Sequence, residues 1–140
     1  MYSSQSDLEK RIDPQLLCAL TDDDADGLAD EPVIAAAIAD ADGLIDTYLR
    51  ARYTVPFDPV PDTVRSISAA VAIYFLLTRR HEIVPVEHLK RHEAAVQLLD
   101  HLARGAIALG AGQPSASPHL PQSNREPDDR TFDADSLESY

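Results

Sequence analysis

The 140-residue sequence has no tryptophan, one cysteine and only 6% aromatic residues. One cysteine excludes an internal disulfide framework. Cys18 lies in the apolar run 16–20, where we expect it to act as a small buried hydrophobic residue and not as a nucleophile. Because aromatic residues are so scarce, the core must be built mainly from Ala, Ile, Leu and Val.

Long apolar segments and targeting signals are also missing. The longest apolar run, residues 69–77, has nine residues, far short of the roughly 20 that are needed to span a bilayer. Residues 1–7 contain neither the basic nor the apolar region of a secretory signal. We therefore expect a soluble protein that is made in the cytoplasm and has no membrane partner.

The sequence also lacks the common motifs of enzymes. It has no Gly-rich phosphate loop, no Gly-x-Ser-x-Gly motif and no paired carboxylates in an apolar setting. His88 and His92 have the i, i+4 spacing of zinc ligands on a helix, but no convincing further ligands accompany them. We interpret them as core or interface residues, and we predict neither catalysis nor a cofactor.

Basic residues are few, 12 against 24 acidic ones, which gives a net charge of −12. The charge is uneven: residues 7–46 carry −10, residues 47–110 carry +2 and residues 111–140 carry −4. Affinity for nucleic acid comes mainly from neutralising phosphates, so a monomer of this chain should not bind DNA. The uneven charge would instead suit oppositely charged neighbours, including copies of the chain itself.

The composition changes near Gly110. Before this point apolar residues recur at helical spacing, whereas residues 111–124 contain three prolines and no periodicity. Such a composition is typical of an extended, flexible segment. We therefore predict a helical domain over residues 1–110, followed by an extended flexible arm over residues 111–140.

Four helical stretches in residues 1–110 predict an all-α fold, a small bundle of about four helices. The first is short and is interrupted at Asp13-Pro14, with Ser6 and Glu9 at capping-box spacing. The second begins near Asp30 and keeps its apolar residues on one face; Gly43 in its interior indicates a weak or closely packed point.

The remaining stretches follow a proline-rich connector at residues 53–61, which must be extended with its apolar side chains packed down. Residues 62–80 are apolar nearly all round and predict the central helix. Residues 86–104 predict the last helix, which ends at Gly105. Its expected inward residues are Leu89, Val96, Leu99 and Ala103.

An acidic segment at residues 22–30 resembles a calcium-binding EF-hand loop. Its ligand positions one, three, five and nine are Asp22, Asp24, Asp26 and Asp30. Position twelve, which should supply a bidentate Glu, is Val33. We therefore interpret the segment as an acidic turn that caps the second helix, and keep calcium as a weaker alternative. A similar string at residues 40–46 falls within a helix, where we expect its aspartates on the solvent face.

The end of the chain combines acidic residues with isolated large apolar ones. Disordered acidic tails usually dispense with such residues. We therefore predict an arm that docks in a groove on another chain, although a loose end with incidental apolar residues remains the alternative. Its expected contact residues are Arg130, Phe132, Leu137 and Tyr140.

Several strings of residues together carry a family resemblance. The most specific is Ile45-Asp46-x-Tyr48-Leu49-x-x-Arg52-Tyr53-x-x-Pro56; others are Leu20-Thr21-Asp22-Asp23, Arg79-Arg80 and Arg130-x-Phe132-x4-Leu137-x2-Tyr140. Over nearly its whole length the chain resembles a family of small proteins encoded among the head genes of Mu-like phages and prophages. The gene neighbourhood and helical layout of that family are similar to those of head–tail adaptor proteins of long-tailed phages.

This resemblance implies a structural virion protein at the head–tail junction. The chain would form a homo-oligomeric ring, roughly twelve-fold by analogy with the portal, and bind the portal protein and a tail-side neck or terminator protein. DNA would pass through its lumen without specific binding. The expected contact loop contains Arg52, Tyr53, Pro56 and Phe57. Two alternatives stay open: a calcium-responsive interaction module that uses residues 22–30, and an acidic, host-directed phage regulator.

Overall fold

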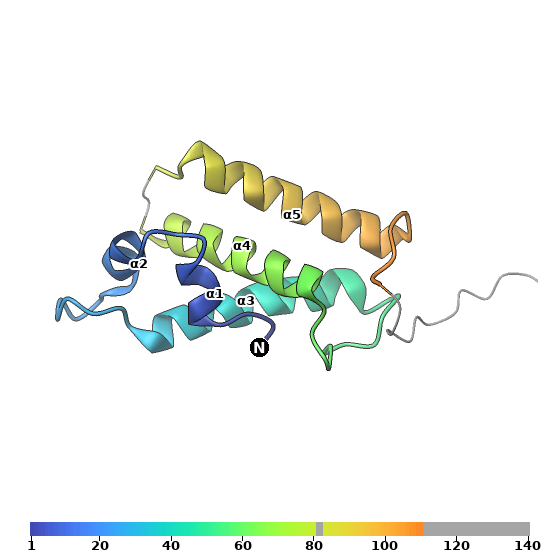
Figure 1. The fold of residues 1–140 in the computed structure, drawn as a ribbon, viewed down its shortest axis with the longest axis horizontal. Helices are drawn as coiled ribbons and strands as arrows, with labels where there is room; N and C mark the ends of the chain where they lie inside the picture. Colours follow the sequence, from blue (N-terminus) through green and yellow to red (C-terminus); the bar gives the residue numbers. More distant parts are fainter. Residues whose placement is uncertain (81–82, 111–140) are drawn as a thin grey trace, which may run out of the picture.

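The computed structural model describes residues 1–80 and 83–110. Within these ranges the chain forms five helices and no strand, which confirms the expected all-α bundle (Figure 1). The helices are α1 (Gln5–Glu9), α2 (Pro14–Thr21), α3 (Glu31–Leu49), α4 (Asp62–Arg79) and α5 (Val86–Arg104). The expected arm over residues 111–140 lies outside the described residues.

Helix α4 is the centre of the bundle, as its sequence predicts. It packs against the other four helices, and half of its eighteen residues are buried. The long helices α3, α4 and α5 run in alternating directions, while α1 and α2 lie across one side (Figure 1). Helix α3 buries the expected stripe at steps of three and four, from Ile34 through Ala41 and Ile45 to Leu49.

The start of the chain differs from the predicted one. The capping box pairs Ser4 with Asp7, not Ser6 with Glu9. The Ser4 hydroxyl accepts the Asp7 N–H at 3.3 Å, and the Asp7 carboxylate accepts the Ser4 N–H at 2.9 Å. The helix therefore begins at Gln5, after the cap at Ser4. The two residues before the cap, Tyr2 and Ser3, are buried. The predicted break before Pro14 is confirmed, with the Asp13 carboxylate accepting the Gln15 N–H at 2.9 Å.

Helix α5 ends as predicted at Gly105, which has a left-handed φ of +77°. Its inward face was only partly predicted. Leu99 is buried, but Val96 and Ala103 are half-buried and Leu89 is 37% exposed. The buried residues are Ala95, Leu99 and Leu102. The His92 ring stacks on Tyr74 of α4 with centroids 3.8 Å apart, so the face of α5 that carries His92 contacts α4.

The connector between α3 and α4 packs its apolar side chains as expected. Tyr53 and Phe57 are buried, with ring centroids 6.0 Å apart, and the Val55–Pro56 and Asp58–Pro59 peptide bonds are cis. Cys18 is half-buried, whereas full burial was expected, and its thiol donates to the Gly27 carbonyl at 3.3 Å. None of the helices in the described residues has the length and apolar character that crossing a membrane requires.

Replacement by alanine should have opposite effects on stability at Gly43, inside α3, and at Gly105, which caps α5. A Cβ at Gly43, inside α3, would meet nothing within 4 Å. Of the two alternatives for this glycine, close packing is therefore excluded, and a weak point in the helix is the one that stays. Gly43→Ala should therefore raise the free energy of unfolding by about 0.5–1 kcal/mol, since Gly weakens a helix interior. Thermal unfolding followed by circular dichroism measures the change.

Gly105→Ala is the matched control. A Cβ there would lie 2.2 Å from the Arg52 Nη1 atom, on a backbone with positive φ. We expect destabilisation by at least about 1 kcal/mol. If both variants moved the melting temperature in the same direction, this account of the two glycines would be wrong.

Candidate functional site

The acidic loop, residues 22–30, connects α2 to α3 and folds around its own backbone. The Asp22 carboxylate accepts the N–H groups of Asp26 and Gly27 at 3.1 and 2.9 Å. Asp26 in turn accepts the Leu28 N–H at 2.8 Å. The turn requires left-handed backbone at Ala25 and Gly27, with φ of +61° and +83°. Short Asp side chains suit this role because they bond readily to nearby backbone N–H groups.

The loop does not cap α3 through a side chain, contrary to the sequence interpretation. Asp30 occupies the N-cap position but makes no capping hydrogen bond. Its carboxylate turns back and accepts the Asp23 N–H at 2.9 Å, which closes the loop on itself. Glu31 in the first turn keeps a favourable position at the positive end of the helix dipole.

Three carboxylates of the loop converge. One oxygen from each of Asp22, Asp24 and Asp30 lies within 4.8 Å of the others. The Asp26 N–H favours the charged form of Asp24, but desolvation and the charges of Asp26 and Asp30 raise the pKa of Asp24 overall. Oxygen ligands of this kind suit a hard cation. However, Asp26 stands outside the group, and Val33 supplies no ligand at the twelfth position.

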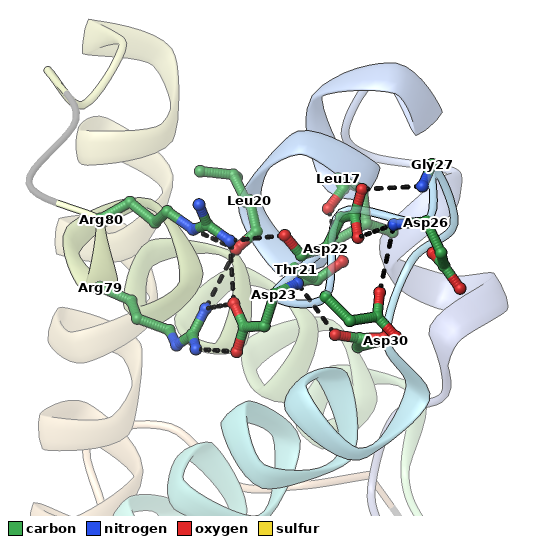
Figure 2. A network of polar contacts seen from close by, with 11 residues as sticks. Leu17, Leu20, Thr21, Asp22, Asp23, Asp26, Gly27, Asp30, Arg79 and Arg80 are labelled. Atoms are coloured by element: carbon green, nitrogen blue, oxygen red, sulfur yellow. Dashed lines mark hydrogen bonds and ion pairs between the residues drawn. The ribbon is translucent and has the colours of Figure 1, made fainter.

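Two arginines at the end of α4 hold this loop in place (Figure 2). We call Arg79 and Arg80 the arginine pair. Both form ion pairs with Asp23, Arg80 at 2.8 Å and Arg79 through two contacts. Both also donate to the Leu20 carbonyl at the end of α2, at 3.2 and 3.3 Å, and Arg80 reaches the Asp22 carbonyl at 2.9 Å.

The arginine pair thereby joins three elements at one end of the bundle. The last carbonyls of a helix have no partner within the helix, and the pair supplies donors to one of them at Leu20. The hydrogen bond from Arg79, with the charges of both arginines, holds the pKa of Asp23 below its ordinary value. Local sequence patterns do not indicate these contacts, because Asp23 and Arg79 are 56 positions apart.

A second polar cluster, which sequence reasoning missed, fixes the start of the chain. Tyr2 donates its backbone N–H to Asp42 at 2.9 Å and its hydroxyl to Asp46, and accepts the Phe57 N–H at 3.2 Å. Burial, followed by the hydrogen bond to Asp46, raises the Tyr2 pKa. The expectation that the aspartates of residues 40–46 lie on the solvent face is therefore wrong for Asp42 and Asp46.

Buried serines extend this cluster into α4. The Ser68 hydroxyl donates to Asp42 at 2.7 Å and lies 2.8 Å from the Ser3 hydroxyl. Both serines are buried, at 0% and 5% exposure. Buried polar groups need such partners, so the cluster fixes residues 2–3 against α3 and α4. Small polar residues between apolar ones, such as Ser68 in the run of α4, were the available signal.

The expected contact loop is largely turned inward. Tyr53 and Phe57 are 5% and 4% exposed, and the Tyr53 hydroxyl accepts the Leu109 N–H at 3.3 Å. Arg52 is half-buried against Gly105, and Pro56 is exposed. A partner could therefore touch Pro56 and part of Arg52, whereas the two rings serve the core. The expected arm residues, Arg130, Phe132, Leu137 and Tyr140, lie outside the described residues.

His88 and His92, the candidate zinc ligands, belong to no convergent set of ligands within the described part of the chain. Both are half-buried, and burial lowers their pKa values. His92 stacks flat on Tyr74, with an interplanar angle of 9°. This position agrees with the interpretation of His92 as a packing residue.

The chain belongs to the family described as Bacteriophage Mu, Gp36, which matches residues 2–126. It is 33% identical over 81 residues to the Mu-like prophage FluMu protein gp36 of Haemophilus influenzae, covering 58% of this chain and 55% of that protein. It is 32% identical over 120 residues to Gene product J of Escherichia phage Mu, covering 84% and 82% of the two chains. The expected membership of a Mu-like phage family is confirmed.

We predict that Asp23→Asn lowers the melting temperature at neutral pH, because the arginine pair loses its carboxylate. The pKa of Asp23 is depressed in the folded state, so its stabilisation is present above the unfolded pKa and is lost as the pH falls through the folded one. The difference between parent and variant should therefore shrink as the pH falls below the unfolded pKa of aspartate. Asp24→Asn, in the same loop but without an arginine, is the control and should not lower the melting temperature.

The double change Asp22→Ala, Asp24→Ala tests the cation hypothesis. We expect a folded protein with a modest loss of stability, because the loop loses backbone hydrogen bonds but keeps Asp23. Melting curves in EDTA and in CaCl₂ should coincide for both proteins. A calcium-dependent rise in the parent that is absent from the variant would establish the loop as a cation site.

Proposed function

We propose that the chain is a structural protein of the phage particle, a head–tail connector subunit. It forms a homo-oligomeric ring on the portal protein, roughly twelve-fold, and joins the DNA-filled head to a tail-side neck or terminator protein. The observation that carries this proposal is membership of the phage Mu Gp36 family over residues 2–126. In this role the chain needs neither a catalytic site nor a cofactor.

The polar clusters of the fold support a structural role. The arginine pair connects α4 to α2 and to the acidic loop, and the Tyr2 cluster connects the start of the chain to α3 and α4. Their hydrogen bonds thus join separate segments of one subunit. A subunit that bears load between two larger assemblies benefits from such cross-links, because they keep its surfaces in a fixed relation.

The charge distribution suits a ring. Residues 7–46 carry −10 and residues 47–110 carry +2, so two different faces of neighbouring subunits can attract each other. An interface between two different faces closes into a ring when the rotation permits. An acidic lumen would repel the phosphates of passing DNA, which then moves through without specific binding.

One specific observation favours a second candidate. The convergence of Asp22, Asp24 and Asp30 within 4.8 Å would suit a calcium-responsive interaction module. The missing ligand at Val33 and the backbone hydrogen bonds already held by Asp22 and Asp30 favour the connector role instead. Melting curves with and without calcium separate the two.

Negative-stain imaging of purified portal, with and without the full chain, tests the connector role. We expect an additional ring of density on one face of the portal, with the symmetry of the portal. Portal particles that look the same with and without an excess of the chain would overturn the proposal. A tight one-to-one complex with a host DNA-binding protein would point to a host-directed regulator.

The arm supplies a second test of this role. Phe132→Ala with Tyr140→Ala should leave the described bundle folded, since neither residue belongs to it. Truncating an aromatic residue at an interface commonly costs about 2 kcal/mol or more, so two losses per subunit should release the protein from portal or filled heads. Co-sedimentation measures the bound fraction.

Two comparisons sharpen this test. Thr131→Ala with Ser139→Ala changes neighbouring positions without removing a ring and should sediment like the parent. Arg130→Ala should weaken binding less than the aromatic pair, because an exposed charge contributes under about 1 kcal/mol. Full binding by the aromatic double variant would place the contact elsewhere on the chain.

A further inference from the structure

The surface carries a groove between α4, α5 and the turn at Lys10 and Arg11 that follows α1. Helix α4 packs against both α1 and α5. The groove encloses about 790 Å³. Its apolar lining includes Ile67, Ala70 and Leu98, and its charged lining includes Lys10, Arg11 and Arg91. It therefore combines an apolar surface with positive charge, on a chain whose net charge is −12.

The arginines of this groove lack acidic partners. Arg11 donates to the Asp7 carbonyl and to the Ser66 hydroxyl, at 3.1 and 3.0 Å. Arg91 donates to the Arg11 carbonyl at 3.2 Å. All three acceptors are neutral, and neither arginine forms an ion pair within the described residues.

The other charges at the groove leave this positive character intact. Lys10 lies 4.0 Å from Asp7, with its side chain 70% exposed. Asp62 is the one acidic lining residue within the described ranges, and it pairs with Arg65 at 3.1 Å. Lys10 and Arg11 are also the only bases in residues 7–46. Both bases of the most acidic part of the sequence therefore line the groove.

The end of the same chain has the complementary chemistry. Residues 125–140 contain six acidic residues and two arginines, together with Phe132, Leu137 and Tyr140. Large apolar side chains suit the lining of the groove, and the acidic residues suit the unpaired guanidinium groups. Residues 111–124 can span up to about 45 Å, so this segment can reach a groove on another molecule.

We propose that the groove between α4, α5 and the turn after α1 binds residues 125–140 of a second copy of this chain. The proposal deepens the connector function and rests on it, because it assigns the contact by which one ring subunit holds the next. Groove and segment are different surfaces, so each copy can give one contact and receive another, as a closed ring requires.

Photo-crosslinking of the full chain tests the contact. Phe132 is replaced by p-benzoylphenylalanine, which keeps a large apolar side chain, and the protein is mixed with an equal amount of ¹⁵N-labelled chain lacking the probe. After irradiation, mass spectrometry locates the crosslinked peptides. We expect crosslinks between labelled and unlabelled chains that map to α4 and α5 at residues 62–70 and 91–98.

Charge variants provide the matched comparison. Arg91→Glu should lower the yield of groove crosslinks about two- to fivefold, the effect of an exposed charge contact. Lys90→Glu makes the same change of charge one position away, outside the groove lining, and should leave the yield unchanged. Arg91→Lys should restore most of it. Circular dichroism melting confirms that each variant is folded.

The possible outcomes separate this proposal from the connector function. Crosslinks that map to the acidic loop, that stay within one chain, or that fail to form would overturn the groove assignment. Equal losses in Arg91→Glu and Lys90→Glu would also overturn it. If groove crosslinks form between chains but no ring appears on portal particles, the groove assignment stands and the connector function fails. If a ring appears but the crosslinks map elsewhere, the connector function stands and the groove assignment fails.

Discussion

The middle of helix α4 is apolar on nearly every side, so most of its faces there must be shielded from water. No single partner helix can do this, because one helix covers only one face of another. The long helices α3 and α5 cover two sides, and the short helices α1 and α2 cover much of the rest. The first 21 residues therefore lie across one side of the three long helices, where they cover α4 (Figure 1).

Covering α4 with short helices creates a second demand. Helices of five and eight residues cannot hold themselves in place through local hydrogen bonds alone. Long-range polar contacts hold both short helices in place. The arginine pair binds the end of α2, and the Tyr2 cluster fixes the segment that leads into α1. The first set of contacts lies at the ends of α2 and α4, whereas the second uses carboxylates and a hydroxyl inside α3 and α4.

Much of the fold could be predicted from periodicity, which reports burial along one element. The bounds of α3, α4 and α5, the break at Pro14 and the stop at Gly105 are all indicated by local spacing and capping residues. Contacts between distant segments could not be predicted in this way. Asp23 with Arg79, and Tyr2 with Asp42, depend on how the helices pack, and an exposed-looking Asp in a helix gives no sign that it accepts a buried hydroxyl.

Leu109 fixes the end of the described residues against the bundle. This residue is buried, and its N–H is held by the Tyr53 hydroxyl at 3.3 Å. The residues after Gly110 are therefore attached to a fixed point beside the α3–α4 connector. A segment tethered at such a point meets nearby surfaces at an effective concentration set by tether length, which reaches the millimolar range for short linkers. If the segment docks as proposed, weak contacts would be well occupied within an assembly, although the same peptide free in solution would scarcely bind.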